Sequence, residues 1–144
     1  MKHIPQIKSV MTPFPYFVGL TSTLRQAKQV MSDRAIRHLP VMDDHRLVGM
    51  LTDRDIKLIL GPETDGQSQD AILVKDVFIE KIYMVELTEP LDNVLLHMAN
   101  NHIGSALVTK DGRLAGLFTV TDACKYFGEF LREHFLPLHG NDAA

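Results

Sequence analysis

Short apolar runs and one helical stripe follow each other along the first sixty residues. Residues 16–18 form a β-prone run, and residues 38–42 and 47–51 form two more that a polar turn joins. Between them, apolar residues recur at the spacing of one helix face, namely Leu24, Ala27, Val30 and Met31. Thr21 or Ser22 is expected to cap this helix through its hydroxyl. A second helix is expected to begin at Thr52, so the pattern predicts the order β-α-β-β-α.

The same order of elements returns 67 residues later in the chain, a shift that aligns Lys8 with Lys75. About 16 of roughly 50 positions are identical at this shift, where ordinary residue usage gives roughly three by chance. The helix of the second copy is expected to begin near Thr88, and Asp111-Gly112 between two apolar runs indicates a hairpin. A unit of about 50–60 residues buries little surface alone, so the two copies are expected to pack sheet against sheet.

The chain divides into four parts on this pattern. The first repeat with its N-terminal lead-in covers residues 1–60, a polar linker rich in Gly and Pro covers 61–73, and the second repeat covers 74–126. Residues 127–144 extend the last helix. Its apolar stripe consists of Phe127, Phe130, Leu131 and Phe135, which either forms a dimer surface or packs back on its own domain.

Composition narrows the class of protein. The chain has 144 residues and a formal net charge of −3, so the general basic surface of a nucleic-acid-binding protein is missing. Cys124 is the single cysteine and cannot form an intramolecular disulfide, which favours a reducing compartment. No stretch reaches the ~18 apolar residues of a membrane span, and the N-terminus has no signal-peptide pattern. A soluble cytoplasmic protein is therefore expected.

Each repeat carries the same polar motif where its second helix begins, a Thr followed three residues later by an Asp. Thr52 and Asp55 form the first copy, and Thr119 and Asp122 form the second. One interpretation is a capping box that stabilises the helix and binds nothing. The other is a nucleotide site, because the first turn of a helix attracts anions and a carboxylate there can accept hydrogen bonds from a ribose diol.

These motifs resemble a tandem pair of cystathionine-β-synthase (CBS) domains, also called a Bateman module, over residues 8–125. The segments that carry the resemblance are 10–13, 36–41 and 49–56 in the first repeat, and 103–108 and 116–122 in the second. The resemblance implies an α/β fold of two β-α-β-β-α units related by a pseudo-two-fold axis. It also implies two inter-repeat clefts that bind adenosine nucleotides, and dimerisation into a flat disc.

The resemblance also assigns roles to the residues at the matching positions. The expected ligand-binding residues are Asp55 and Asp122 for ribose, Thr52 and Thr119 for a ribose or phosphate oxygen, Arg37 and His38 for phosphate, Ile36 and Ile103 beside the adenine, and the corner residues Thr21, Ser22, Thr88 and Glu89 over the base.

The two expected clefts differ in charge. Arg37, His38 and Arg54 accompany the first Thr-x-x-Asp motif and supply cations for two or three phosphates. In the second cleft Gly104 and Ser105 replace the basic pair, which leaves base and ribose contacts but weakens the expected phosphate binding. The first cleft is therefore the expected nucleotide site, although Arg37 can also project across the pseudo-two-fold axis toward the second.

The resulting hypothesis is a non-enzymatic regulatory module that binds AMP, ADP, ATP or a related compound and signals to a partner or a dimer mate. The alternative is a structural or dimerisation subunit with vestigial clefts that acts through its C-terminal aromatic helix. No cofactor is expected to be required. Catalysis and metal binding are not expected, because Cys124 is interpreted as a buried small residue and His97 and His102 are poorly spaced for a shared metal.

Overall fold

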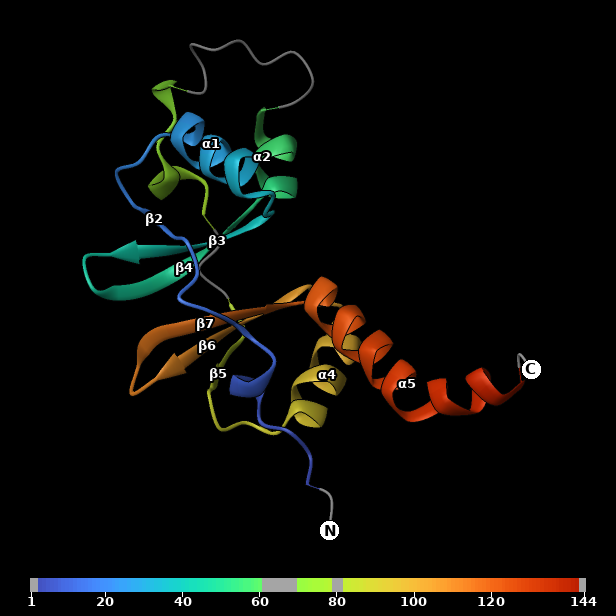
Figure 1. The fold of residues 1–144 in the computed structure, drawn as a ribbon. Helices are drawn as coiled ribbons and strands as arrows, with labels where there is room; N and C mark the ends of the chain where they lie inside the picture. The colour runs from blue at the N-terminus through green and yellow to red at the C-terminus, as the bar shows by residue number, and fades with distance from the viewer. Residues whose placement is uncertain (1–2, 61–69, 79–81, 143–144) are drawn as a thin grey trace.

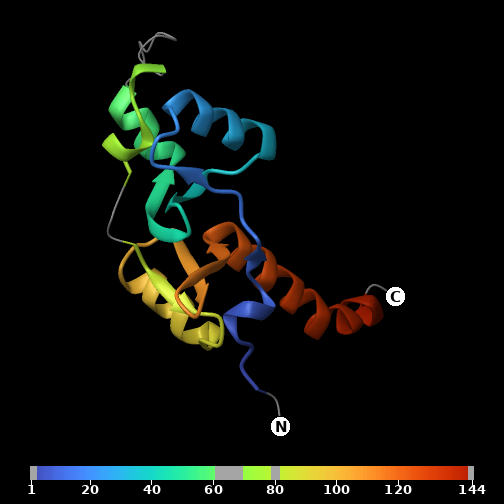
Figure 2. The ribbon, with the colours of Figure 1, turned by 90° about the vertical axis from the view of Figure 1, so that its left-hand side faces the viewer.

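The computed structural model describes residues 3–60, 70–78 and 82–142, and side-chain positions as far as residue 135. Two α/β units lie one above the other, each with a sheet that faces the other unit and helices on the outer side (Figure 1). The view at 90° shows the same layering (Figure 2). The predicted fold class of two β-α-β-β-α repeats is confirmed.

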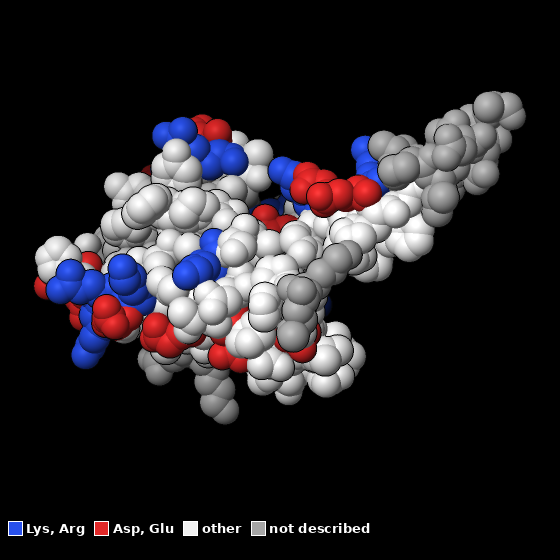
Figure 3. All heavy atoms as spheres, turned by 60° about the horizontal axis from the view of Figure 1, so that its bottom comes forward, with Lys and Arg blue, Asp and Glu red and all other residues white. Residues whose placement is uncertain are grey.

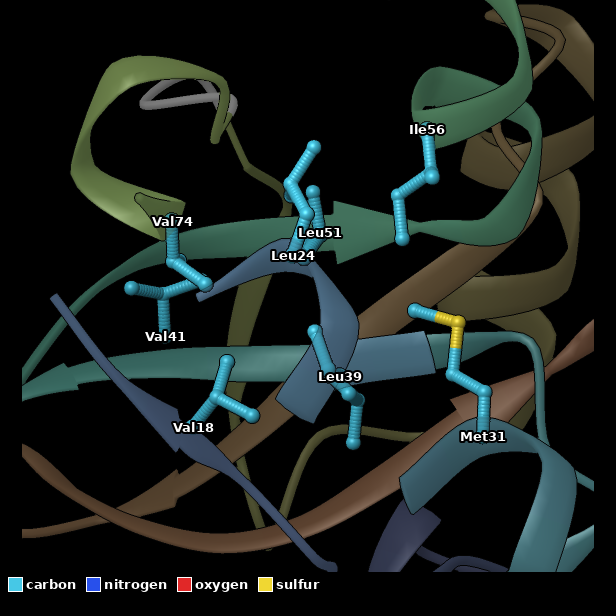
Figure 4. Packing of buried hydrophobic residues seen from close by; sticks show 9 residues of the cluster. Val18, Leu24, Met31, Leu39, Val41, Leu51, Ile56 and Val74 are labelled. Carbon is cyan, nitrogen blue, oxygen red and sulfur yellow. The ribbon is translucent and has the colours of Figure 1, made fainter. Parts of the chain in front are cut away.

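The first unit contains β2 (Val18–Gly19), α1 (Leu24–Arg34), β3 (His38–Asp43), β4 (Arg46–Thr52) and α2 (Asp53–Leu60). Its sheet has the order β2-β3-β4, with β2 parallel to β3 and β3 antiparallel to β4. Buried side chains from both strands and helices meet between the layers (Figure 4). The predicted N-cap of α1 is wrong by one or two residues. Thr23, and not Thr21 or Ser22, forms a capping box with Gln26.

The second unit repeats this arrangement with β5 (Met84–Glu86), α4 (Leu91–Asn100), β6 (Ser105–Lys110), β7 (Arg113–Thr119) and α5 (Val120–Asp142). Its sheet has the order β1-β7-β6-β5, since β1 (Thr12–Pro13) joins it at the edge. Gly116 allows that close pairing, because a Cβ there would come within 3.0 Å of the Thr12 carbonyl oxygen. The hairpin between β6 and β7 turns at Asp111 and Gly112, both with positive φ, as predicted.

The short segments that precede each repeat pack against the other repeat. The 3-10 helix η1 (Ile7–Ser9) places Ile7 in the core of the second unit, and η2 (Val74–Asp76) places Val74 in the core of the first. Their backbone bonds match, since the Ile7 amide donates to the Glu89 carbonyl and the Val74 amide donates to the Ser22 carbonyl, each at 2.8 Å. Each predicted repeat, 1–60 and 74–126, therefore contributes a short segment to the core of the other. Residues 61–69 of the predicted linker lie outside the described residues.

The two sheets meet through a separate apolar cluster. Met50, Leu107 and Leu117 are buried there, and partly buried apolar residues from β4, β7 and the start of the second unit pack against them. This cluster confirms the expectation that the repeats pack sheet against sheet. It also fixes the relative position of the two Thr-x-x-Asp corners, which end β4 and β7.

The helix α5 continues well beyond the body of the molecule (Figure 1). The side chains of its predicted stripe are exposed within this chain, at 58% for Phe127, 38% for Phe130, 39% for Leu131 and 49% for Phe135. The stripe therefore does not pack back on its own domain. The interpretation of Cys124 as a buried residue is wrong, because the cysteine is exposed on the same helix.

The charged side chains are mixed on the face that Figure 3 shows, where basic and acidic groups alternate between larger uncharged areas. Within the described residues, no helix has both the length and the apolar composition needed to cross a membrane.

Candidate functional site

The Thr119–Asp122 corner shows how the chain positions a carboxylate at a helix N-terminus. The strand β7 ends at Thr119, and α5 begins at the next residue. Asp122 Oδ2 accepts hydrogen bonds from the Thr119 amide at 2.9 Å and from the Thr119 hydroxyl at 3.1 Å. The Asp122 amide donates back to the Thr119 hydroxyl oxygen at 3.3 Å. Both bonds to the carboxylate end on Oδ2, so Oδ1 keeps its capacity to accept a hydrogen bond from a ligand.

The Thr52–Asp55 corner has the same design in the first unit. The Thr52 hydroxyl donates to Asp55 Oδ2 at 2.6 Å, and the Asp55 amide donates to the Thr52 hydroxyl oxygen at 3.1 Å. The register of the hairpin sets His38 opposite Thr52, as it sets Ser105 opposite Thr119. The capping box is complete at Thr119 and Asp122, whereas the described bonds at Thr52 and Asp55 are its amide-to-hydroxyl half and the bond between the two side chains. Both arrangements are compatible with a ligand at the same place.

The largest cavity at these corners has a volume of about 850 Å³ and lies between the two repeats; we call it the Asp122 cavity. Its volume is within the range of small-molecule sites, ~300–1,000 Å³. The first repeat contributes one wall and the end of the second repeat contributes the other. The lining residues used below are Phe14, Tyr16, Ile36, Arg37, His38, Thr119 and Asp122.

A smaller cavity of about 430 Å³ lies at the equivalent position, and we call it the Tyr83 cavity. It brings Thr52 of the first repeat to Ile103 and Ser105 of the second. Tyr83 and His97 also line it, and their rings stack with centroids 4.0 Å apart. Burial, together with the nearby Glu89 carboxylate, raises the pKa of the Tyr83 phenol, so this side chain stays neutral. Other apolar lining residues are Met50, Ile82 and Leu107.

A third depression of about 380 Å³, the basic pocket, adjoins the first turn of α2. Arg37, Arg54 and Lys57 line it together with His38 and Thr52. Lys57 is partly neutralised because its ammonium lies 2.9 Å from the Asp53 carboxylate. Among the described residues, no carboxylate lies within ion-pair distance of the Arg37 or Arg54 guanidinium. These two groups are therefore available to an anion.

His38 borders both the Asp122 cavity and the basic pocket. Burial lowers the pKa of its imidazole below the usual 6.5, and the Arg37 charge lowers it further, while Asp55 and Asp122 act in the opposite direction. Both carboxylates of the repeated motif thus act on one imidazole. His38 is neutral at neutral pH and can serve as a hydrogen-bond donor or acceptor there.

The chain reaches this position because of a turn at the end of α1. Ala35 adopts the left-handed conformation, φ 55°, and the Ile36 amide donates to the Met31 carbonyl. The helix therefore stops and residues 36–38 run along the cavity into β3. His102, φ 53°, makes the equivalent turn before Ile103 in the second repeat.

The structure gathers most of the predicted ligand-binding residues but pairs them differently. Arg37 and His38 line the cavity of Asp122, as well as the basic pocket with Thr52 and Arg54. Asp55 is not among the residues that line the three cavities. The sequence favoured a nucleotide site at Asp55 and left open that Arg37 projects toward Asp122. The geometry supports the second possibility better than the first.

The four predicted corner residues Thr21, Ser22, Thr88 and Glu89 do not line these cavities. The corners hold the exchanged 3-10 helices instead, through the Ser22 and Glu89 carbonyls. Sequence reasoning missed Tyr83, His97 and Phe14 as lining residues. The repeat offered a signal for Tyr83, since the equivalent Tyr16 lines the other cavity. No group of three or more potential metal ligands occurs in the part of the chain that the structure describes.

Fold and cavities together define a duplicated α/β module with a pair of pseudo-symmetric sites between its repeats. The chain belongs to the CBS domain family, whose model matches it twice, over residues 7–61 and 74–129.

Among known proteins, the chain is 31% identical to hypoxic response protein 1 of Mycobacterium tuberculosis over 113 residues, which cover 78% of each chain. It is 25% identical to the L-aspartate semialdehyde sulfurtransferase of Methanocaldococcus jannaschii but spans only 24% of that protein's length. Two crystal structures share the fold. A candidate acetoin utilization protein (AcuB) of Vibrio cholerae has a TM-score of 0.79 and 24% identity, covering 92% of this chain and 98% of that one. A CBS domain pair in complex with 5'-methylthioadenosine and S-adenosyl-L-methionine has a TM-score of 0.72 and 23% identity, covering 88% and 98%.

Proposed function

We propose that this protein is a regulatory module that binds an adenosine nucleotide, such as AMP, ADP or ATP, in the Asp122 cavity. The observation that carries the proposal is the Asp122 carboxylate, fixed at a helix N-terminus inside a cavity that also contains Arg37, whose guanidinium forms no ion pair with any described residue. The adenine would lie beside Ile36, and the ribose hydroxyls would donate to Asp122. The phosphates would bind Arg37 and extend toward the basic pocket.

The chemistry of the cavity supports this assignment. Ionised Asp122 accepts hydrogen bonds only, which suits a ribose diol with two donors. The Arg37 guanidinium offers planar donor geometry that matches a phosphate group. The likeness to a CBS domain pair that binds 5'-methylthioadenosine and S-adenosyl-L-methionine supports an adenosine-containing ligand, since both of those ligands contain adenosine.

The same geometry supports regulation over catalysis. Ile36, Arg37 and His38 come from the first repeat, while Thr119 and Asp122 come from the second, so a ligand would bridge the two units. A ligand changes a conformational balance only by binding one arrangement more tightly than another, and a bridging ligand does so. The signal would pass to a dimer mate or to a partner in trans, and we place the protein in the cytoplasm, where a single cysteine is normal.

The experiment is calorimetric titration of the full chain with AMP, ADP and ATP. We expect saturable binding, and a more than tenfold loss of AMP affinity in Asp122→Asn, because a hydrogen bond to a charged group contributes about 1.5–3 kcal/mol. Asp111→Asn is the matched control, since it makes the same change in an exposed turn where Asn adopts positive φ readily. No binding by the wild type, or equal affinities of wild type and Asp122→Asn, contradicts the proposal.

A second candidate function is a dimerisation subunit that acts through α5. The exposure of Phe127, Phe130, Leu131 and Phe135 favours it, because a row of exposed apolar side chains on one helix is typical of an interface. Sizing of the full chain against a chain that ends at Lys125 tests this function. Loss of an oligomer on truncation supports it, and a full-length chain that stays monomeric contradicts it.

A further inference from the structure

The segment 12–16 forms one rim of the Asp122 cavity. It leaves η1 in the second unit, pairs with β7 as β1 and then crosses to β2 in the first unit (Figure 1). The Phe14 amide donates to the Ala115 carbonyl at 3.2 Å, which ties the segment to β7 just beyond the paired residues. Pro13 and Pro15 flank Phe14, and their fixed φ angles stiffen the backbone on both sides.

Phe14 occupies an unfavourable position in two respects. Its φ is +48°, a conformation that asparagine, aspartate and glycine adopt readily and a bulky side chain adopts rarely. Phe14 is also 91% exposed although it lines the cavity, so most of its apolar surface is in water. Residues held in such conformations are concentrated at ligand-binding sites.

Other positions of positive φ in the described chain show how unusual Phe14 is. Asp44 and Asp111 lie in hairpin turns and are residue types that tolerate the left-handed region, and Ala35 ends α1. Phe14 is not a residue type that adopts positive φ readily, and it does not lie at the end of a helix. A ligand that covered its ring would remove the exposure.

A second ring stands on the same rim. Tyr16 lines the cavity, and the Arg34 guanidinium lies 4.5 Å from the centre of its ring, which holds the phenol in place. Ile36, an apolar residue from the turn at the end of α1, lines the same cavity. Two aromatic residues and an aliphatic one therefore line one cavity, and this composition suits a flat aromatic ligand, since bases stack well on aromatic faces.

We infer that Phe14 is a ligand-covering residue, whose ring closes over a planar purine base bound between Ile36 and Asp122. The inference rests on the proposed nucleotide function of the cavity and adds the residue that stacks on the ligand's base. Binding buries the exposed ring, and the strained backbone keeps the ring presented before the ligand arrives.

The test compares the full chain with Phe14→Asn and Phe14→Tyr. Asn relieves the backbone and removes the ring, so the ligand-free Tm should rise by about 3 °C while AMP binds about tenfold more weakly. Phe14→Tyr keeps the ring and should keep the AMP affinity within about twofold. In proton NMR, the adenine H2 and H8 signals of AMP should shift upfield on binding to wild type, and the shift should shrink in Phe14→Asn.

Two matched controls separate strain from stacking. His102→Asn places an Asn at another left-handed position outside the three cavities, and should raise Tm without changing AMP affinity. Phe17→Asn removes an exposed ring that does not line the cavity, and should leave AMP affinity unchanged.

Each remaining outcome identifies what fails. Equal AMP affinity in wild type and Phe14→Asn overturns the inference and leaves the proposed nucleotide function intact, provided that Asp122→Asn still weakens binding. No AMP, ADP or ATP binding by the wild type overturns both. A change of oligomeric state in Phe14→Asn, measured by sizing, overturns the inference because the ring would then serve a contact between copies.

Discussion

The two inter-repeat cavities share one backbone frame and differ in the side chains that line it. In each, the start of a strand from one repeat lies in the same cavity as the Thr at the last helix of the other repeat, and a left-handed residue turns the chain into the cavity. At the start of β3, Arg37 and His38 line the Asp122 cavity. At the equivalent start of β6, next to the Tyr83 cavity, the residues are Gly104 and Ser105. The volumes differ as well, at about 850 Å³ and 430 Å³.

The difference teaches that packing and ligand chemistry reside in different residues of this repeat. The core positions keep their apolar character in both copies, since Leu51 and Phe118 occupy equivalent strand positions and are both fully buried. The cavity positions lie at the ends of elements, where a change of charge disturbs little packing. The duplicated frame can therefore carry two sites with different ligand preferences.

The largest expected effect is on stability and concerns the apolar core that both repeats have. Phe118→Ala should lower the free energy of unfolding by about 3–5 kcal/mol, and Leu51→Ala by about 2–5 kcal/mol, because each leaves a cavity in a fully packed core. Chemical denaturation of both variants measures this. A loss below about 1 kcal/mol in either one would contradict the equivalence of the two cores.

A second prediction concerns the two carboxylates. Asp122→Asn should weaken AMP binding by more than tenfold, whereas Asp55→Asn should change it by less than about twofold, since only Asp122 lines a cavity that also contains Arg37. Calorimetry on the two variants in the same buffer makes the comparison. The reverse order of effects would move the nucleotide site to the first motif.

A third prediction separates the phosphates from the nucleoside. Arg37→Ala should weaken ATP binding by about tenfold, because a charge-assisted hydrogen bond is lost, and should leave adenosine binding within about twofold. Titrations with ATP and adenosine provide the ratio, and an equal loss for both ligands would show that Arg37 does not contact phosphate.

The smallest expected effect is a pH dependence from His38. Because burial lowers the pKa of His38 in the folded protein, the unfolded chain binds a proton first as the pH falls through about 6.5. The free energy of unfolding should therefore decrease as the pH is lowered through this window. His38→Gln should reduce the slope of the free energy of unfolding against pH.

Denaturation at pH 7.5 and pH 5.5 measures that slope. His45→Gln, in the exposed turn after β3, is the control and should behave as the wild type does. An unchanged slope in His38→Gln would mean that the imidazole is not kept neutral by its surroundings.

The fold was predictable because the repeat doubles every signal. Three residues of the helical stripe, Leu24, Ala27 and Met31, are buried as expected, and Val30 is partly buried. The strands of the first hairpin lie within one residue of their predicted bounds. Thr52 and Thr119 were found at the starts of the second helices, since capping follows from local sequence alone. Local rules suffice for elements whose partners lie nearby in the chain.

The composition of the cavities was less predictable because it depends on partners far apart in the sequence. The exchange of η1 and η2 between the units places residues 12–16 beside Asp122, and no local pattern reports such an exchange. The Thr23 cap was missed because three successive hydroxyl residues, 21–23, compete for the same role. Arg37 and His38 lie in the cavity of Asp122 because of the way in which the two repeats pack, and the local sequence does not predict this pairing.

The most direct test of the account is a crystal structure of the full chain grown with AMP. The account predicts one nucleotide in the Asp122 cavity, with its ribose hydroxyls within hydrogen-bond distance of Asp122, its adenine beside Ile36 and its phosphate on Arg37. A nucleotide bound instead between Tyr83 and Thr52, or crystals without AMP at a concentration that saturates binding in solution, would contradict it.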